Sequence, residues 1–328
     1  MVASPEVKKV FLLRSKIIKA IRDFLDSRGF LEVETPMMHD VAGGAAGRPF
    51  KTHHNEYSME LYLRIAPELY LKRLLVGGLD KVYEINRSFR NEGVSTRHNP
   101  EFTMLEIYQA YANYKNMMQL AQDLFVSVAK NVLNDTRFTY QGKAIDLALP
   151  WAERSFAGLV EEKFGIKPSD ETSVMLKKLQ EKGFAQGRNK LTRSQIAKII
   201  EDTLEQEMST GPTFITDYFT DLCPLAKTKS DNPLLSERFE LYIAGLEVGN
   251  AYSELNDPIE QKRRFEEEIK GLSPEEKKNV DQDYILALEH GMPPAGGLGI
   301  GIDRLVMLLT DQPSIREVIF FPLLRPEK

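Results

Sequence analysis

Polar and hydrophobic residues alternate in two stretches, and this alternation predicts β-strands. From Phe102 to Ala110 every second side chain lies on one face, because strand side chains repeat with a period of two, and Glu106 shares that face. Residues 239–243 alternate in the same way, and Ala244-Gly245 predicts a tight hairpin into the next strand. A half-buried carboxylate needs a cationic partner, so Glu106 indicates either a solvated edge strand or a binding site.

Helical spacing of apolar residues marks the remaining elements. Residues 7–25 predict a long helix that is capped by Ser4, has Pro5 in its first turn and ends at Gly29. Three shorter stretches with the same spacing lie at 155–164, 174–179 and 196–204, where Lys, Glu and Gln dominate. We therefore predict an α/β (α+β) fold in which an antiparallel sheet is flanked by helices. Residues 1–150 and 214–328 form its two halves, and residues 151–213 form a small helical insertion in which we find no candidate chemistry.

Composition narrows the function classes. An apolar fraction of 42% with 28% charged residues is typical of a globular protein that needs no membrane, and no apolar run approaches the roughly 20 residues that cross a bilayer. The single cysteine, Cys223, excludes an internal disulfide and fits a reducing compartment, so we expect a cytoplasmic location. A net charge of −5 argues against general nucleic-acid binding but permits a local RNA contact.

Cationic residues are concentrated around one predicted loop. The loop follows a strand that ends near Phe89 and precedes a strand that begins near Phe102. Arg87, Arg90 and Arg97 lie within this short segment, and guanidinium groups at this density repel one another unless an anion such as a phosphate binds among them. The glycine-rich segment 296–301 lacks the spacing and the following βαβ unit of a dinucleotide fingerprint. The loop therefore favours a phosphate-containing ligand that is bound in another way.

Three motifs carry a resemblance to a known family. Phe89-Arg90-Asn91-Glu92 followed by Arg97-His98-Asn99-Pro100-Glu101-Phe102 resembles motif 2 of class II aminoacyl-tRNA synthetases, in the form found in lysyl-tRNA synthetase. The helix and strand up to Pro36 resemble motif 1, and the segment from Gly296 to Met307 resembles motif 3. The resemblance runs from about Pro5 to Pro326. It implies ATP-dependent activation of L-lysine to lysyl-adenylate, transfer to the 3′ end of tRNA(Lys), and a homodimer through motif 1.

The resemblance also implies roles for individual residues. Arg90 would contact the α-phosphate of ATP and the substrate carboxylate, Phe102 would stack on adenine, and Arg304 would pack over adenine and contact the γ-phosphate. The catalytic residues would be Arg90 and Arg304. The lysine-binding residues would be Gly44, Glu68, Arg90, Glu106, Tyr108, Asn250, Tyr252 and Glu254. The ATP-binding residues would be Arg90, Glu92, His98, Asn99, Phe102, Glu240, Glu247 and Arg304.

A magnesium site is implied at the predicted hairpin. If residues 243 and 246 pair, Glu240 lies opposite Gly249 and diagonal to Glu247, at roughly 7–8 Å between Cβ atoms. Two carboxylates at that separation could share Mg²⁺ ions with ATP, although an exposed acidic edge is the alternative. Asn250, like Tyr252 and Glu254, has the opposite parity to Glu247, so we predict a β-bulge near Gly249.

The predicted amino-acid pocket is anionic. Glu106, Tyr108 and Glu254 supply acceptors and negative charge that favour a cationic side chain, while Glu68 either caps the helix that follows Pro67 or binds the substrate's α-ammonium group. The chain begins almost directly at the first helix of the catalytic domain, without the N-terminal anticodon-binding domain of the family. We therefore expect weak recognition of the tRNA acceptor end. Two alternatives stay open: a stand-alone paralogue that transfers lysine to elongation factor P, and an inactive regulatory protein.

Overall fold

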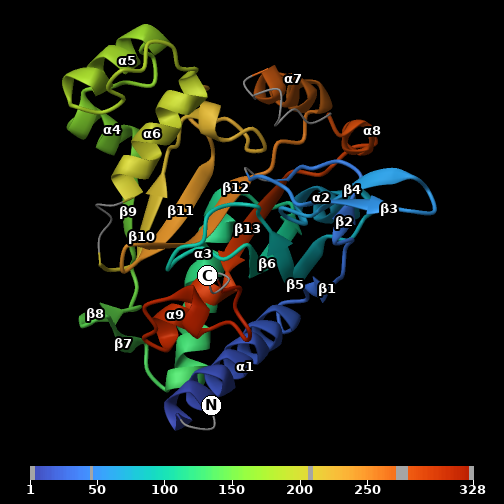
Figure 1. Ribbon diagram of the computed structural model, residues 1–328, viewed down its shortest axis with the longest axis vertical. Helices are drawn as coiled ribbons and strands as arrows, with labels where there is room; N and C mark the ends of the chain where they lie inside the picture. Colours follow the sequence, from blue (N-terminus) through green and yellow to red (C-terminus); the bar gives the residue numbers. More distant parts are fainter. Residues whose placement is uncertain (1–3, 45–46, 206–209, 271–279, 325–328) are drawn as a thin grey trace.

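An eight-stranded sheet forms the centre of the computed structural model, which describes residues 4–44, 47–205, 210–270 and 280–324 (Figure 1). In spatial order its strands are β1 (Leu31–Glu32), β5 (Lys81–Phe89), β6 (Glu101–Ala110), β13 (Ala295–Gly301), β12 (Leu246–Ser253), β11 (Arg238–Ile243), β10 (Thr213–Thr216) and β9 (Ala152–Ser155). Neighbouring strands are antiparallel, except that β1 and β9 at the two edges run parallel to β5 and β10. The predicted antiparallel sheet is confirmed.

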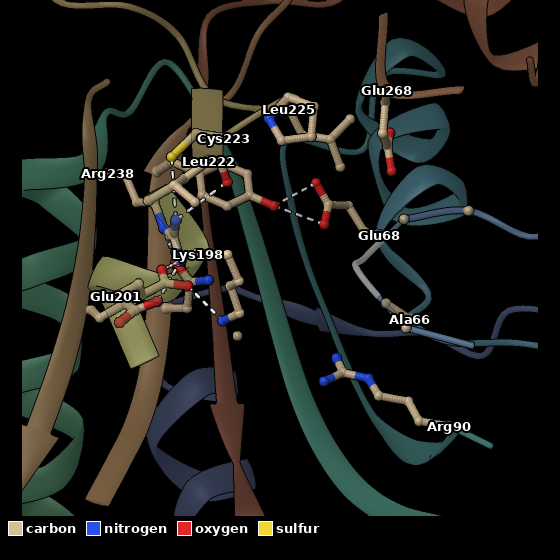
Figure 2. Close-up of a pocket in the computed structure, with 18 of the residues that line it drawn as sticks. Ala66, Glu68, Arg90, Lys198, Glu201, Leu222, Cys223, Leu225, Arg238 and Glu268 are labelled. Atoms are coloured by element: carbon tan, nitrogen blue, oxygen red, sulfur yellow. Dashed lines mark hydrogen bonds and ion pairs between the residues drawn. The ribbon is translucent and has the colours of Figure 1, made fainter. Parts of the chain in front are cut away.

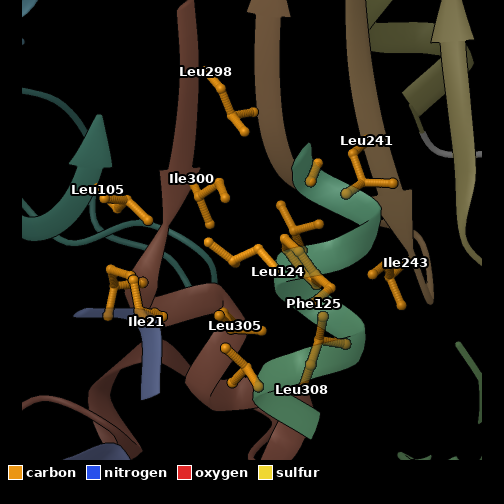
Figure 3. Packing of buried hydrophobic residues seen from close by; sticks show 14 of the residues in the cluster. Ile21, Leu105, Leu124, Phe125, Leu241, Ile243, Leu298, Ile300, Leu305 and Leu308 are labelled. Atoms are coloured by element: carbon orange, nitrogen blue, oxygen red, sulfur yellow. The ribbon is translucent and has the colours of Figure 1, made fainter. Parts of the chain in front are cut away.

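One face of the sheet is covered by a helical layer of α1 (Pro5–Asp26), α3 (Tyr114–Leu133) and α9 (Ile302–Leu309) (Figure 3). Leu105 and Ile107 of β6 and Leu298 and Ile300 of β13 point into this layer and are almost completely buried. Each such side chain contributes about 1.5–3 kcal/mol by leaving water. Because strand side chains alternate, the intervening residues of β6 and β13 face the opposite side.

The opposite face is only partly covered. The helices α2 (Glu68–Val76) and α8 (Gln282–Glu289) pack there in a second apolar cluster that includes Leu71, Tyr108 and Tyr284. Beside them lies α7 (Pro258–Lys270). Smaller elements lie outside the main sheet. They are a three-stranded sheet of β2 (Met38–His39), β4 (Met59–Leu63) and β3 (Lys51–His54), a hairpin of β7 (Arg137–Tyr140) and β8 (Lys143–Asp146), and the short 3₁₀ helices Thr220–Leu222 and Ile315–Glu317.

Three helices occupy the region predicted as an insertion. They are α4 (Phe156–Phe164), α5 (Thr172–Glu181) and α6 (Arg193–Glu205), and they pack in a third apolar cluster against β10 and β11 (Figure 1). The predicted helical stretches are confirmed. The edge strand β9 also falls inside the range 151–213 and belongs to the main sheet. No helix in the described part of the chain combines the length and apolar character needed to cross a membrane.

The N-terminal helix differs in detail from its prediction. Ser4 occupies the N-cap position, but its side chain makes no capping hydrogen bond, and Pro5 lacks the N–H group that a first-turn residue would expose. The helix ends at Asp26 and not at Gly29. The Ser27 amide still makes a helical bond to Asp23, but the Arg28 and Gly29 amides bond only three residues back, to Leu25 and Asp26, in a tighter turn. Gly29 follows in that turn with φ = +76°.

A buried ion pair joins the two ends of the chain. Arg14 of α1 donates from Nη1 to Asp303 Oδ1 at 2.6 Å and from Nη2 to Thr103 Oγ1 at 3.0 Å. The second oxygen of Asp303 accepts the Thr103 amide at 2.8 Å, so one carboxylate ties α9 to both α1 and β6. This network fixes the first turn of α9, where Arg304 follows Asp303.

Candidate active site

A cavity of about 1440 Å³ lies on the sheet face that the helical layer leaves open (Figure 2). Small-molecule sites usually enclose roughly 300–1,000 Å³, so this cavity has space for two ligands. Strands β6, β11, β12 and β13 form its floor, while α2, α6, α7 and the loop after β5 form its walls. It is lined by every predicted site residue, namely Gly44, Glu68, Arg90, Glu92, His98, Asn99, Phe102, Glu106, Tyr108, Glu240, Glu247, Asn250, Tyr252, Glu254 and Arg304.

A change of register between β11 and β12 brings the predicted site residues of these two strands to the same cavity. The register shifts between Leu241 and Tyr242, so β12 carries one extra residue at that point. This confirms the bulge predicted near Gly249. Simple pairing placed Glu240 opposite Gly249, which is wrong: after the shift Glu240 pairs with Asn250. The residues on both sides of the bulge consequently face the same cavity.

Three buried carboxylates meet at one end of the cavity. Glu68 and Glu106 are each 5% exposed, and Glu254 is completely buried. The Tyr252 hydroxyl lies 2.8 Å from both Glu68 oxygens, and the Tyr108 hydroxyl donates to Glu106 at 2.9 Å. Glu68 therefore faces the cavity and makes no bond that would cap its own helix.

A lysine that the sequence analysis did not identify lies among these carboxylates. Lys72 is fully buried in α2, one turn after Glu68, and donates to Glu68 Oε1 at 2.6 Å. Its Nζ also pairs with Glu254 Oε2 and lies 5.5 Å from the centre of the Tyr252 ring. The i, i+4 spacing of Glu68 and Lys72 was the available sequence signal. Glu254 Oε1, by contrast, is buried without a hydrogen-bond partner among the described residues.

The charges in this cluster are strongly coupled. Burial and then the charge of Glu68 raise the pKa of Glu106 to about 8. Burial alone would lower the pKa of Lys72, but the carboxylates of Glu254 and Glu68 outweigh burial and raise that pKa, so Lys72 stays charged. Burial raises the pKa of Glu254, and the adjacent Lys72 ammonium group opposes that rise. Burial thus favours the protonated form of Glu106 and Glu254, while Lys72 supplies a positive charge beside Glu68 and Glu254.

Gly297 lies beneath the carboxylate end of the cavity, where its missing side chain leaves room for Glu254 and Tyr108. A Cβ atom at this position would overlap the Glu254 carboxylate and come within 2.6 Å of the Tyr108 ring. Gly297, Gly299 and Gly301 of β13 face the cavity, while Leu298 and Ile300 face the core and Gly296 packs against Met117 of α3, as strand alternation requires.

The other end of the cavity carries arginines. Arg90 projects into the cavity apart from Glu68 (Figure 2), with its guanidinium carbon 5.1 Å from the centre of the Phe102 ring. Its Nε is buried and has no hydrogen-bond partner in the described ranges. Burial lowers the pKa of Arg90, which indicates that the folded chain solvates this cation poorly. A buried guanidinium nitrogen without a partner is a site for an anion.

Arg304 lies across from Arg90, in the first turn of α9 as predicted. Its Nη1 donates to the Glu247 carbonyl at 2.6 Å and to the Glu247 carboxylate at 3.1 Å. Its Nη2 lies 3.2 Å from His98 Nε2, which must accept, so the ring proton is on Nδ1 beside Ser95. Burial, and then the charge of Arg304, lower the pKa of His98, which keeps this imidazole neutral near pH 7.

The two predicted magnesium ligands differ in how they are held. Glu247 is half-exposed beside Arg304. Glu240 is buried and accepts from Arg238, from the Tyr218 hydroxyl at 2.7 Å and from the Tyr242 hydroxyl at 2.7 Å. These bonds use three of about four lone-pair directions of the carboxylate, so one direction remains for a cation. A Mg²⁺ ion that keeps most of its ligands from phosphate and water needs no more than this from the protein.

The insertion also contributes to the cavity wall, which its sequence did not indicate. Glu201 of α6 accepts from Lys198 at 2.6 Å and from Arg238 at 3.5 Å (Figure 2). Arg238 in turn holds Glu240. The pairing of α6 with β11 joins residues 37 positions apart, so local periodicity could not reveal it.

The remaining predicted residues lie around these groups. Asn250 accepts from Arg238 Nε at 3.2 Å, and Asn99 donates to the Glu101 carbonyl at 2.7 Å. Glu92 accepts the Arg48 amide at 3.3 Å. Gly44 has φ = +88°, a conformation that glycine adopts readily, in the loop from Gly43 to Gly47. Residues 45 and 46 of that predicted loop lie outside the described residues.

Comparison with known proteins identifies the class. The family model "tRNA synthetases class II (D, K and N)" matches residues 1–325, and the chain belongs to this family. Among its curated relatives, the lysine-tRNA ligase of Carboxydothermus hydrogenoformans is 55% identical over 99% of this chain and 67% of its own length. The lysine-tRNA ligases of Pelotomaculum thermopropionicum and Moorella thermoacetica are 54% and 53% identical over the whole chain, which spans 66% and 68% of their lengths. The chain thus spans about two thirds of the relatives that it matches.

Proposed function

We propose that this chain activates L-lysine with ATP and transfers the lysyl group to the 3′ end of tRNA(Lys). The observation that carries the proposal is one cavity with complementary ends. Glu254 Oε1 lies at one end and Arg90 Nε at the other, and each is buried without a hydrogen-bond partner in the part of the chain that the structure describes. An ammonium group fits the first and a phosphate or carboxylate fits the second. The relatives named lysine-tRNA ligase support the same activity.

Activation requires no nucleophile from the protein. The carboxylate of bound lysine attacks the α-phosphorus of ATP, the bond to the β-phosphate breaks, and pyrophosphate leaves. The chain's part is to align the two substrates and stabilise negative charge, with Arg90 at the α-phosphate and Arg304 at the γ-phosphate. Phe102 offers a ring for adenine, and Arg90 already lies over its face. Neutral His98 accepts from Arg304 and helps to orient it.

Magnesium would be held by Glu240 and Glu247, and it would offset the negative charge of the phosphates. Both carboxylates line the cavity, and Glu247 contacts Arg304 there. Arg238 and the tyrosines around Glu240 fix the orientation of that carboxylate before any cation binds.

Selection of lysine would rest on charge and size. A carboxylate within 3–4 Å of the ε-ammonium group contributes about 4–5 kcal/mol before desolvation at an effective dielectric of ~20. Glu106, Tyr108 and Glu254 would surround that group, and Gly44, Glu68, Asn250 and Tyr252 would contact the rest of the amino acid. Aspartate would meet like charge, and arginine would need a planar fork of acceptors.

We propose tRNA as the acceptor, contacted through its acceptor end and with a strong dependence on salt concentration. A paralogue that modifies elongation factor P and an inactive regulatory protein are not favoured, because the close relatives carry the name lysine-tRNA ligase. Lysine-dependent pyrophosphate exchange tests activation directly, and its absence would reject the proposal. Radiolabelled lysine offered with tRNA(Lys) or with elongation factor P then separates the two acceptors.

We also propose a cytoplasmic homodimer in which the motif 1 region meets its copy. Apolar side chains remain exposed there on α1, β1 and β2: Leu12 is 57%, Leu31 50% and Met38 55% exposed. Such side chains in one region favour a protein interface. Analytical ultracentrifugation at micromolar concentration should give a dimer, and a monomer would contradict this part of the proposal.

A further inference from the structure

The proposed lysine site contains an ammonium group that belongs to the protein. Lys72 is 0% exposed and lies behind the cavity wall, bonded to Glu68 Oε1 at 2.6 Å and paired with Glu254 Oε2. The two carboxylates face the cavity from different elements, α2 and the end of β12. The single ammonium group of Lys72 therefore links Glu68 on one wall of the site to Glu254 on the other.

We propose that Lys72 is a specificity-determining residue: its ammonium group is the counter-ion that orients Glu68 and Glu254 in the site, so that the site accepts an amino acid with two ammonium groups. This inference rests on the proposed function and deepens it. Lys72 acts through the carboxylates and does not line the cavity itself. It is thus a positioning residue with respect to the substrate.

The charge count of the occupied site supports this role. Glu68, Glu106 and Glu254 carry three negative charges when ionised. Bound lysine brings an α- and an ε-ammonium group, and Lys72 adds a third positive charge, while the substrate carboxylate is balanced by Arg90. A desolvated site in which the charges balance avoids the large penalty of an uncompensated buried charge. An amino acid with a neutral side chain would leave one carboxylate unbalanced.

Without Lys72 the ammonium group that opposes the rise in the pKa of Glu254 would be missing, so burial would favour the protonated acid more strongly. Buried acids that lie close together cannot all ionise without a cation among them. A protonated Glu254 is a neutral group, which discriminates poorly between an ammonium group and a methyl group. Loss of the Lys72 charge should therefore reduce selectivity for lysine, beyond any effect on folding.

The neighbouring residue provides a matched control. Arg73 also lies in α2 and pairs with Asp281 at 2.8 Å and with Asp283 at 3.3 Å, but it lies outside the cavity lining. Arg73→Met removes one cation from the same helix together with its ion pairs to Asp281 and Asp283. It should lower thermal stability without changing the choice of amino acid.

The experiment compares Lys72→Met, Lys72→Gln, Lys72→Arg and Arg73→Met with the wild type in pyrophosphate exchange. KM for lysine, KM for ATP and kcat are measured, and norleucine, which has an unbranched neutral side chain, is the competing substrate. Thermal denaturation reports the fold. Lys72→Gln keeps hydrogen-bond donors at similar length, so it separates loss of charge from loss of packing and serves if Lys72→Met does not fold. Wild-type exchange with lysine tests the proposed function alone.

We expect both neutral variants at Lys72 to raise KM for lysine at least 20-fold and to change KM for ATP less than threefold. The ratio of kcat/KM for lysine over norleucine should fall at least tenfold in both, and Lys72→Arg should restore most of it. If the neutral variants keep that ratio within twofold of an active wild type, or raise both KM values alike, Lys72 is only a structural residue and the inference is overturned.

Discussion

Lysine binding should release a proton from Glu106. The carboxyl of Glu106 ordinarily has a pKa of 4.5, and burial with the charge of Glu68 raises this pKa to about 8. The empty pocket therefore holds the proton at pH 7, whereas an adjacent substrate ammonium group favours the ionised carboxylate. Because the bound state binds fewer protons, lysine affinity must increase as pH rises toward 8. Below that pKa each pH unit changes the affinity about tenfold, so Kd should fall roughly tenfold between pH 6 and pH 7.

Isothermal titration calorimetry of lysine binding without ATP measures both the dependence of Kd on pH and the number of protons released. Titrations in two buffers of different ionisation enthalpy should show release of close to one proton near pH 7. In Glu106→Gln the number of protons released on binding should fall by about one, so Kd should lose most of its pH dependence. Kd for lysine should also rise at least tenfold at pH 7.5. Glu289→Gln, the same change at an exposed position of α8, should keep the wild-type slope. A flat wild-type profile between pH 6 and pH 7.5, or an unchanged slope in Glu106→Gln, would refute the assignment.

Three further substitutions test other parts of the site and fold. Arg90→Ala should cost about 3–4 kcal/mol of transition-state stabilisation, a loss of roughly 10²–10³ in pyrophosphate exchange, and near-normal turnover would remove Arg90 from the mechanism. Gly297→Ala should raise KM for lysine and leave KM for ATP nearly unchanged, because its Cβ would displace Glu254; equal changes in both constants would contradict this. Arg14→Met should lower the free energy of unfolding by about 3–5 kcal/mol in urea titration, since it leaves Asp303 buried without its cation, and an unshifted midpoint would disprove that role.

Local patterns predicted the strands of the site well. The alternation from Phe102 to Ala110 places Glu106 and Tyr108 on the cavity face, and the hairpin at Ala244 and Gly245 forms with both residues at positive φ. These features depend on residues that are neighbours in the chain. The bulge was predictable because the site residues of β12 occupy both odd and even positions. The residue that pairs with Glu240 could be identified only from the observed strand register.

Contacts between distant segments escaped prediction. Lys72 shows helical spacing from Glu68, a pattern that occurs on many exposed helices, and only its burial against Glu254 marks it as part of the site. Glu201 likewise appears as one charge in a polar insertion until α6 packs beside Arg238. In both cases the side chain is recognised by the burial of its charge, and burial depends on contacts with distant segments that a single sequence does not reveal.

The Arg14 network also bears on the order in which this chain can fold. Its two ion-paired residues are 289 positions apart, so the guanidinium group of α1 gains its carboxylate partner only after α9 has left the ribosome. Until then the first helix has an unsatisfied cation on the side that will be buried. Nascent chains that stop before α9 should therefore remain open to proteases and chaperones, however much of the sheet they already contain.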